Sequence, residues 1–271
     1  MNVMRIFEPH IHMVSRVTDD YEAMAAAGVQ LVLEPALWLG EPRKRVGTFL
    51  DYFDSLLGFE VQRARNHNIE HVCTIAINPR EANNRALAEE VLPHLDTYFA
   101  HDRCVGVGEL GYDDITEAEE DFLKRQLLLA MKHGLPALVH TPHRKKAFGT
   151  QRTIDVCRDV GFPFERLLLD HATEETVKMI LDSGAWCGFT IYPNTKLTPE
   201  RATNMLLEYG VERMMVNSSA DWGPSTVMSV PYTCVEMRRR GFDDASIGKL
   251  VWDNPFSFYD VTGRLSKLRK W

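Results

Sequence analysis

The sequence predicts an α/β protein that folds as a single (β/α)8 TIM-like barrel over residues 1–271. Two observations predict this class. Short β-branched or apolar segments alternate with longer helical patterns along the chain, and eight such units follow one another without a break in composition. Eight β-then-α units are typical of a closed parallel barrel, and a doubly wound open sheet is the alternative.

The elements follow from these patterns. The expected strands are residues 5–12, 29–35, 71–77, 105–111, 136–141, 166–172, 186–192 and 213–219. The expected helices are residues 19–27, 46–66, 81–100, 116–133, 150–160, 174–183, 198–209 and 225–240, followed by a closing pair at 243–252 and 254–261. Glycines 28, 134, 184 and 210 follow expected helices, where a left-handed residue commonly ends the helix. The loop at 35–45 should lie over the barrel mouth.

Composition narrows the class of protein. The chain is 45% hydrophobic and 25% charged, which allows a large core without covalent staples. Five cysteines are scattered without a CxxC pair, so reduced and mostly buried thiols are expected. There is no room for a signal peptide before the first strand, and no apolar segment approaches the ~20 residues of a membrane span. We therefore expect a cytoplasmic protein with no membrane partner.

Histidines gather where a barrel carries its functional groups, at the C-terminal ends of the strands. Four of the ten histidines fall at expected strand ends and a fifth follows closely: His10, His12, His140, His171 and His143. The other five lie in or beside helices or begin a strand, and we interpret them as surface or helix-end residues: His67, His71, His94, His101 and His133.

The pair His10 and His12 is the sharpest feature. Residues i and i+2 of a strand face the same way, so both imidazoles would point into the barrel mouth and could hold one ion. Neutral imidazole suits Zn²⁺, Mn²⁺, Fe²⁺ or Ni²⁺. The alternative is a chance HxH pattern.

Glu109 ends the fourth expected strand in a segment of valines and glycines. Burying an unpaired carboxylate there would cost much free energy, so we expect a metal cation or an arginine to pair with it. The flanking Gly108 and Gly111 would leave room for close approach of a ligand.

Asp221 follows the eighth strand and could bind metal and accept a proton, with a turn or helix cap as the alternative role. His140 and His171 end adjacent apolar strands and should lie in one layer. Together, five strands deliver four histidines, Glu109 and Asp221 to one rim. These are enough ligands for two divalent ions, with Glu109 able to bridge them.

This pattern resembles the TatD-like branch of the amidohydrolase superfamily. The matching residues cover about 5–260 and end with the Asn-Pro-Phe-Ser-Phe segment at 254–258. The resemblance implies that His10, His12 and Asp221 hold one metal, that His140 and His171 hold a second, and that Glu109 bridges the two. It also implies a metal-dependent hydrolase, and several members of the family act as deoxyribonucleases.

The chain departs from the family pattern at three places. Glu8 stands where an aspartate is usual, Thr-Pro-His-Arg follows His140, and Asn-Ser-Ser-Ala precedes Asp221. A strict alignment could place Ser219 at the aspartate position. Asp221 is the only carboxylate nearby and shares strand parity with Ser219, so it is preferred.

The expected reaction is hydrolysis with two divalent ions (Zn, Mn, Mg, Fe or Ni). Asp221 and Glu109 are the expected catalytic residues, and Asp221 would orient or deprotonate the attacking water and pass the proton to the leaving group. His143 and Arg144 are the expected substrate contacts, with Lys145 and Lys146 beside them able to receive an anionic group.

The favoured substrate is a small anionic molecule with an ester bond, preferably a phosphoester. The alternatives are a lactone or carbon–nitrogen bond, DNA exonuclease or other deoxyribonuclease activity, and a non-enzymatic interaction protein. The formal net charge of −7 makes nucleic acid a possible but not a favoured partner. The oligomeric state is not indicated.

Overall fold

The computed structural model describes residues 4–38 and 40–268 and contains one sheet of eight strands in sequential order, each parallel to its neighbours. The strands are β1 (Ile6–Glu8), β2 (Val29–Pro35), β3 (Glu70–Ile75), β4 (Cys104–Gly111), β5 (Ala137–His140), β6 (Leu167–Asp170), β7 (Trp186–Thr190) and β8 (Met214–Asn217). The segments after β1 and β8 then join, because the Ser219 amide donates to the His10 carbonyl at 2.8 Å. A doubly wound sheet would place strands out of sequence, so the predicted barrel is confirmed.

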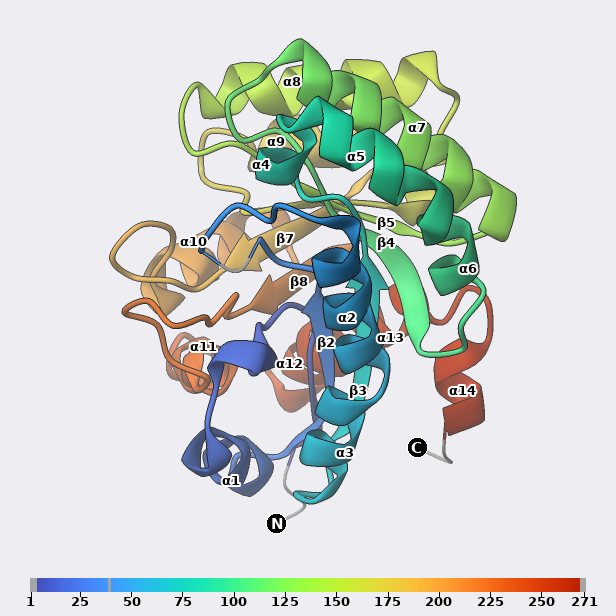
Figure 1. The fold of residues 1–271 in the computed structure, drawn as a ribbon. Helices are drawn as coiled ribbons and strands as arrows, with labels where there is room; N and C mark the ends of the chain where they lie inside the picture. The colour runs from blue at the N-terminus through green and yellow to red at the C-terminus, as the bar shows by residue number, and fades with distance from the viewer. Residues whose placement is uncertain (1–3, 39, 269–271) are drawn as a thin grey trace.

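Helices lie outside the strands all around the barrel (Figure 1). They are α1 (Thr18–Ala26), α2 (Val46–Leu57), α3 (Phe59–Arg65), α4 (Pro79–Ala82), α5 (Arg85–Val91), α6 (Leu95–Phe99), α7 (Glu117–His133), α8 (Lys146–Asp159), α9 (Val177–Ser183), α10 (Pro199–Tyr209), α11 (Ser229–Arg239), α12 (Asp244–Gly248), α13 (Asn254–Tyr259) and α14 (Arg264–Leu268). The longest, α7, ends at the expected glycine and begins with a capping box that was not predicted. The Thr116 hydroxyl accepts from the Glu119 amide at its start, and Gly134 ends it at φ 65°.

Several predicted boundaries were wrong. The helix expected at 46–66 is interrupted at Gly58, and the one at 81–100 is a series of short helices around Pro93. Proline and glycine weaken a helix interior because one lacks the amide donor and the other is conformationally free. Strand β1 ends at Glu8, before Pro9, and β8 ends at Asn217, so both are shorter than expected. Helix α14 was not predicted.

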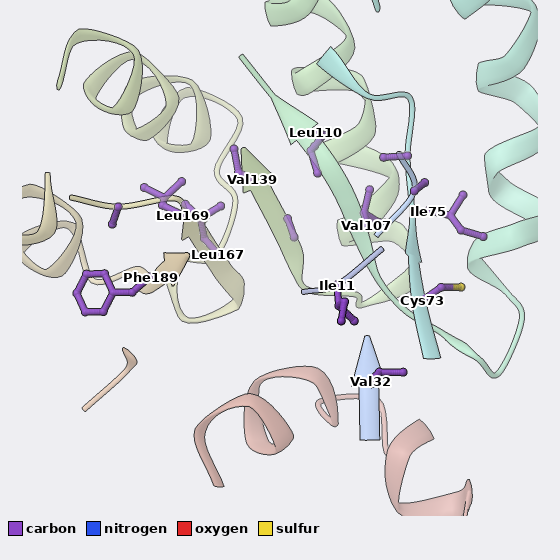
Figure 2. Close-up of a cluster of buried hydrophobic side chains, with 14 of the residues drawn as sticks. Ile11, Val32, Cys73, Ile75, Val107, Leu110, Val139, Leu167, Leu169 and Phe189 are labelled. Carbon is purple, nitrogen blue, oxygen red and sulfur yellow. The ribbon is translucent and has the colours of Figure 1, made fainter. Parts of the chain in front are cut away.

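Apolar residues pack in two layers. One fills the N-terminal half of the barrel interior, where Phe7, Leu138 and Met215 meet Phe258 and Tyr259 of α13. The other lies between strands and helices and includes the outward side chains of β4 and β5 in Figure 2. Asn254 fixes α13 below β8 by donating to the Val211 and Met214 carbonyls at 2.7 and 2.8 Å. With the lower interior filled, the C-terminal ends of the strands are left to carry a site.

Two composition-based expectations can be compared with the structure. All five cysteines are buried and free, as expected. Within residues 4–38 and 40–268, no helix combines the length and the apolar character needed to cross a bilayer.

Candidate metal centre

His10 and His12 converge although they lie just beyond β1 rather than within it. Their Nε2 atoms are 3.2 Å apart, and the two rings are nearly perpendicular. Backbone bonds hold the segment, since the Ile11 amide donates to the Leu33 carbonyl and the His12 amide to that of Ala220. Ile11 packs into the outer apolar layer, so its two neighbours turn inward. The predicted convergence is therefore present without a regular strand.

Glu109, in β4, lies at the junction of two histidine groups. Its Oε1 is 2.9 Å from His171 Nε2, 3.0 Å from His140 Nδ1 and 3.9 Å from His10 Nε2. Two sets of closely spaced potential ligands therefore share this carboxylate, one with His10 and His12 and the other with His140 and His171. Burial opposes ionisation of Glu109, but the adjacent histidines outweigh it and hold the pKa well below its usual value.

The glycines around Glu109 serve strand packing. A Cβ at Gly108 would lie 2.7 Å from the Leu138 carbonyl oxygen, and one at Gly111 would lie 2.4 Å from that of His140. Both glycines therefore let β5 approach β4 closely, and the prediction that they leave room for a ligand was wrong.

His140 and His171 reach Glu109 by different routes. His140 is the last residue of β5, whereas His171 follows β6 in a left-handed conformation with φ 61°. That conformation is uncommon for a residue other than glycine, and it turns the ring toward Glu109 directly after the inward-facing Asp170. The Thr190 hydroxyl lies 2.6 Å from His171 Nδ1, which leaves Nε2 directed at Glu109.

Asp170 is a site residue that the sequence reasoning missed. Its Oδ2 lies 2.6 Å from His10 Nδ1, and its Oδ1 accepts from the His171 amide and from Asn217 Nδ2. Burial raises the pKa of Asp170, but His171 and His10 outweigh that effect and lower it. A histidine that donates Nδ1–H to a carboxylate presents the lone pair of Nε2 to a metal. Glu109 was singled out in the sequence because a carboxylate that ends an apolar strand is costly to bury. The same argument could have identified Asp170, which also ends an apolar strand.

Glu8, which departs from the aspartate expected from the family resemblance, bonds to backbone amides. Its Oε1 accepts from the Ser218 amide at 3.1 Å and the His10 amide at 3.3 Å, so it joins β1 to the segment after β8. Burial raises the pKa of Glu8 to about 8. The His10 ring itself is held by Asp170.

Asp221 and Ser219 both line the same cavity. The Asp221 Oδ1 accepts from the Tyr192 hydroxyl at 3.0 Å and from the Gly223 amide at 2.8 Å. Neither set of closely spaced ligand atoms includes Asp221. The parity argument that linked the two positions does not apply, because β8 ends at Asn217 and Ser219 has φ 42°.

The expected substrate contacts separate in space. His143 lines the cavity, with its ring centroid 6.0 Å from that of His140. Arg144 has a side chain that is 80% exposed, pairs with Asp114, and is absent from the described cavity lining. Lys145 is exposed at the start of α8. Lys146 donates to the Thr141 hydroxyl and the His171 carbonyl, so it supports the segment that carries His171.

The cavity has a volume of about 200 Å³ and contains further polar groups that the sequence did not indicate. Lys196, in the loop after β7, is half-buried there, and burial lowers its pKa against the opposing charges of Glu109, Asp170 and Asp221. Arg80 pairs with Asp113 at 3.0 Å and lies over the Trp38 ring. Trp38 belongs to the loop at 35–45, which was correctly expected at the mouth. No motif surrounds Lys196, so only the fold reveals its position.

The expected surface or helix-end position was wrong for His71. It was interpreted as a surface or helix-end residue, but it is fully buried between barrel and helices, with Nε2 2.9 Å from Glu34 Oε2. In a parallel barrel the outward face of a strand is covered by helices and is as inaccessible as the inward face. A histidine near the start of a strand can therefore be buried.

Comparisons with known proteins agree with the family resemblance seen in the sequence. Residues 10–227 match the family described as TatD-related DNases. An uncharacterized metal-dependent hydrolase of Methanocaldococcus jannaschii is 26% identical over 256 residues, covering 94% of this chain and 99% of that protein. The crystal structure of a TatD-like protein from Archaeoglobus fulgidus is 25% identical, has a TM-score of 0.79, and is matched over 94% of this chain and 100% of its own.

A more distant structure shares the fold. The phosphotriesterase homology protein of Escherichia coli, solved with phosphate in its active site, is 16% identical with a TM-score of 0.70, covering 96% of this chain and 100% of that one.

Proposed function

Because the chain belongs to the TatD-related DNase family and is a metal-dependent hydrolase, we propose that it uses two divalent ions to hydrolyse a phosphoester bond in a small anionic molecule. The whole chain, 1–271, would act as one barrel domain. The observation that carries the proposal is the position of Glu109, whose carboxylate lies between two histidine groups in a cavity that also contains Lys196 and Arg80.

The donor set fits a pair of divalent ions. His10 and His12 would hold one ion, joined by Asp221, which lines the same cavity but lies outside the closely spaced sets, His140 and His171 would hold the other, and Glu109 would serve both. Asp170 and Thr190 support this assignment, since each occupies the Nδ1 side of a histidine whose Nε2 faces the cluster. A set rich in imidazole favours Zn, Fe or Ni over Mg and Mn, which prefer oxygen ligands. When bound, such ions supply a water nucleophile near neutral pH and withdraw electrons from the bond under attack.

Asp221 is our candidate for proton transfer. Tyr192 and Gly223 both donate to its Oδ1, which fixes the carboxylate at the edge of the cavity. We propose that it accepts the proton of the attacking water and returns it to the leaving oxygen. His143, at the rim, is a candidate for contact with the leaving group.

The charge of the cavity favours a phosphoester over a lactone or amide. Lys196 and Arg80 put two cations beside the histidine groups, and the partial burial of Lys196 strengthens its attraction for an anion. A neutral lactone would leave the Lys196 ammonium without an anionic partner from the substrate. The Escherichia coli neighbour, which shares the fold, holds phosphate in its active site, and this supports an anionic ligand. Deoxyribonuclease activity, which the family name favours, is the second candidate.

Substrate screening tests the proposal. Purified protein loaded with Zn²⁺ should bind about two equivalents of metal and turn over p-nitrophenyl phosphate esters. Turnover of single-stranded DNA would favour the second candidate. Cleavage of lactones or amides alone would reject the phosphoester proposal, and metal-free protein after careful loading would reject the metal centre.

A pair of variants tests the proposed contact between Lys196 and the anionic group of the substrate. Lys196→Met should raise KM for an anionic ester by about tenfold while metal content stays constant, because it removes one charge-assisted contact. Arg144→Met, which removes an exposed arginine outside the cavity, is the control and should leave KM unchanged. The opposite result would restore Arg144 as the substrate contact.

A cytoplasmic location is also a proposal. It is supported by the five buried cysteines, all of them free, which suit a reducing compartment.

A further inference from the structure

A second cavity adjoins the metal centre. It has a volume of about 180 Å³ and shares two lining residues, Trp38 and Arg80, with the cavity that contains Glu109. Pro42, Phe49 and Leu87 supply most of the remaining wall. The two cavities therefore meet along the Trp38–Arg80 pair, in which the guanidinium lies 4.4 Å from the centre of the indole ring.

The charged groups in this wall already have partners. The buried Arg43 lies 4.8 Å from the Phe49 ring centroid, donates to the Leu37 carbonyl at 3.0 Å and pairs with Glu81. Arg80 pairs with Asp113. The free volume is consequently bordered by aromatic and aliphatic surface, and the contacts of Arg43 fix the loop that forms one side of it.

The volume indicates the size of the occupant. A cavity of ~150 Å³ lined by apolar side chains holds one benzene molecule. The present cavity therefore fits a single aromatic ring or a compact aliphatic group. A nucleobase is disfavoured, because its polar edge would need several hydrogen-bond partners, and the pairing of Arg43, Arg80 and Glu81 leaves only Asn84 at the rim to offer one.

We propose that the cavity lined by Trp38, Phe49 and Leu87 is a side pocket that binds a monocyclic aromatic or similarly compact apolar group of the substrate. The anionic group of the same molecule would lie beside Lys196 and the histidines. This inference rests on the proposed function and narrows it to esters that carry an apolar leaving group.

Asn84 allows the pocket to be obstructed from its rim. It is exposed, lines the cavity, and its side chain makes no capping hydrogen bond at the start of α5. In Asn84→Trp the indole would occupy the pocket without replacing a core residue, and Asn84→Phe is a smaller obstruction. Ala86→Trp is the matched control, because Ala86 is exposed on the same helix and is absent from the described cavity lining.

The test is calorimetric binding of phenylphosphonate and methylphosphonate to the metal-loaded proteins. In the wild type, phenylphosphonate should bind about 30-fold more tightly, as expected from burial of one ring. Asn84→Trp should reduce this ratio to about threefold or less, Asn84→Phe should give an intermediate value, and Ala86→Trp should preserve it. The affinity for methylphosphonate should be the same in all four proteins, which also verifies that the variants remain folded.

The outcomes separate the pocket from the reaction. An equal affinity for both phosphonates in the wild type, or a ratio that Asn84→Trp leaves unchanged, overturns the pocket even if phosphate esters are hydrolysed. A ratio that behaves as expected without turnover of any phosphate ester rejects the proposed reaction and keeps the pocket. If neither phosphonate binds, the proposal that an anionic group beside Lys196 places the apolar group in the pocket is overturned.

Discussion

Two buried histidine–carboxylate pairs lie on opposite faces of the barrel wall. His10 Nδ1 is 2.6 Å from Asp170 on the inner face, and His71 Nε2 is 2.9 Å from Glu34 on the outer face. The difference is at the second ring nitrogen. His10 Nε2 faces His12 and Glu109, whereas His71 Nδ1 is buried without a hydrogen-bond partner among the described residues. A buried pair of this kind therefore indicates a metal site only when the second nitrogen faces further ligands.

The charges of the two pairs also differ. Burial raises the pKa of Glu34 to about 8 and lowers that of His71 to about 4, so the outer pair is uncharged near neutral pH. The pKa of Asp170 is lowered instead, because His171 and His10 outweigh the effect of burial. The inner carboxylate is charged and can orient a ligand, whereas Glu34 ties the segment after His12 to β2 through the Val14 amide.

The largest expected effect is at Glu109, the carboxylate that His10 Nε2 faces. Glu109→Ala removes the carboxylate between the two histidine groups, so turnover should fall by roughly 1,000-fold or more, a loss of about 4 kcal/mol of transition-state stabilisation. Metal content, measured by elemental analysis, should fall with it. Normal turnover in this variant would remove the central role assigned to Glu109.

The next effect compares the two carboxylates directly. Asp170→Asn should weaken metal binding by about 10- to 100-fold, the usual cost of losing a carboxylate that orients a ligand histidine. Glu34→Gln is the matched control and should leave metal affinity unchanged. Competition with a chromophoric chelator measures both, and an equal loss in the two variants would contradict the distinction drawn between the pairs.

A substitution at Gly188 should move the Asp170 carboxylate without removing its charge. A Cβ at this position would lie 2.2 Å from Asp170 Oδ1, so Gly188→Ala must shift the carboxylate away from its place beside His10. We expect about tenfold weaker metal binding, less than for loss of the charge. Gly47→Ala is the control, since a Cβ there would have no neighbour within 4 Å. Unchanged affinity in Gly188→Ala would show that the Asp170 position is not critical.

The smallest effect concerns stability at the outer pair. The folded pKa of Glu34, about 8, exceeds the ordinary 4.5, so the folded state retains this proton and its contribution to the free energy of unfolding decreases as pH rises between those values. His71 acts oppositely only below about 6.5. From pH 6.5 to 7.5, urea unfolding of the metal-free proteins should show a decrease about 1 kcal/mol greater in the wild type than in Glu34→Gln. Equal slopes would mean that Glu34 is already ionised.

The fold was largely predictable because the parallel strands are covered on both faces and therefore form continuous apolar segments. The expected bounds of β2 were correct. Their places at the strand ends predicted that four histidines converge on Glu109, as the structure shows, and the role of these residues as metal ligands remains a prediction. The irregular parts were not predictable, since the turn at Gly58 and the left-handed His171 depend on tertiary packing that a local pattern does not record.

The two site residues that sequence analysis missed differ in whether the sequence contained a sign of their role. Asp170 follows three leucines in β6, so the cost of burying its charge was visible in the sequence. Lys196 lies in a polar loop and enters the cavity only because β7 and α10 hold that loop over the mouth. Arg144 shows the converse, because a basic run beside His143 was suggestive although its guanidinium pairs with Asp114 at the surface.

The packed apolar floor of the barrel has a kinetic consequence. Phe7, Leu138, Met215 and Tyr259 fill the space below the histidines, so traffic to the reacting centre passes through the mouth at the opposite end. The anionic product of the proposed reaction would then leave by the same route that the next substrate takes, and the two would exclude each other while either is bound. Inhibition by the anionic product should accordingly be competitive with substrate, and high substrate concentrations should abolish it.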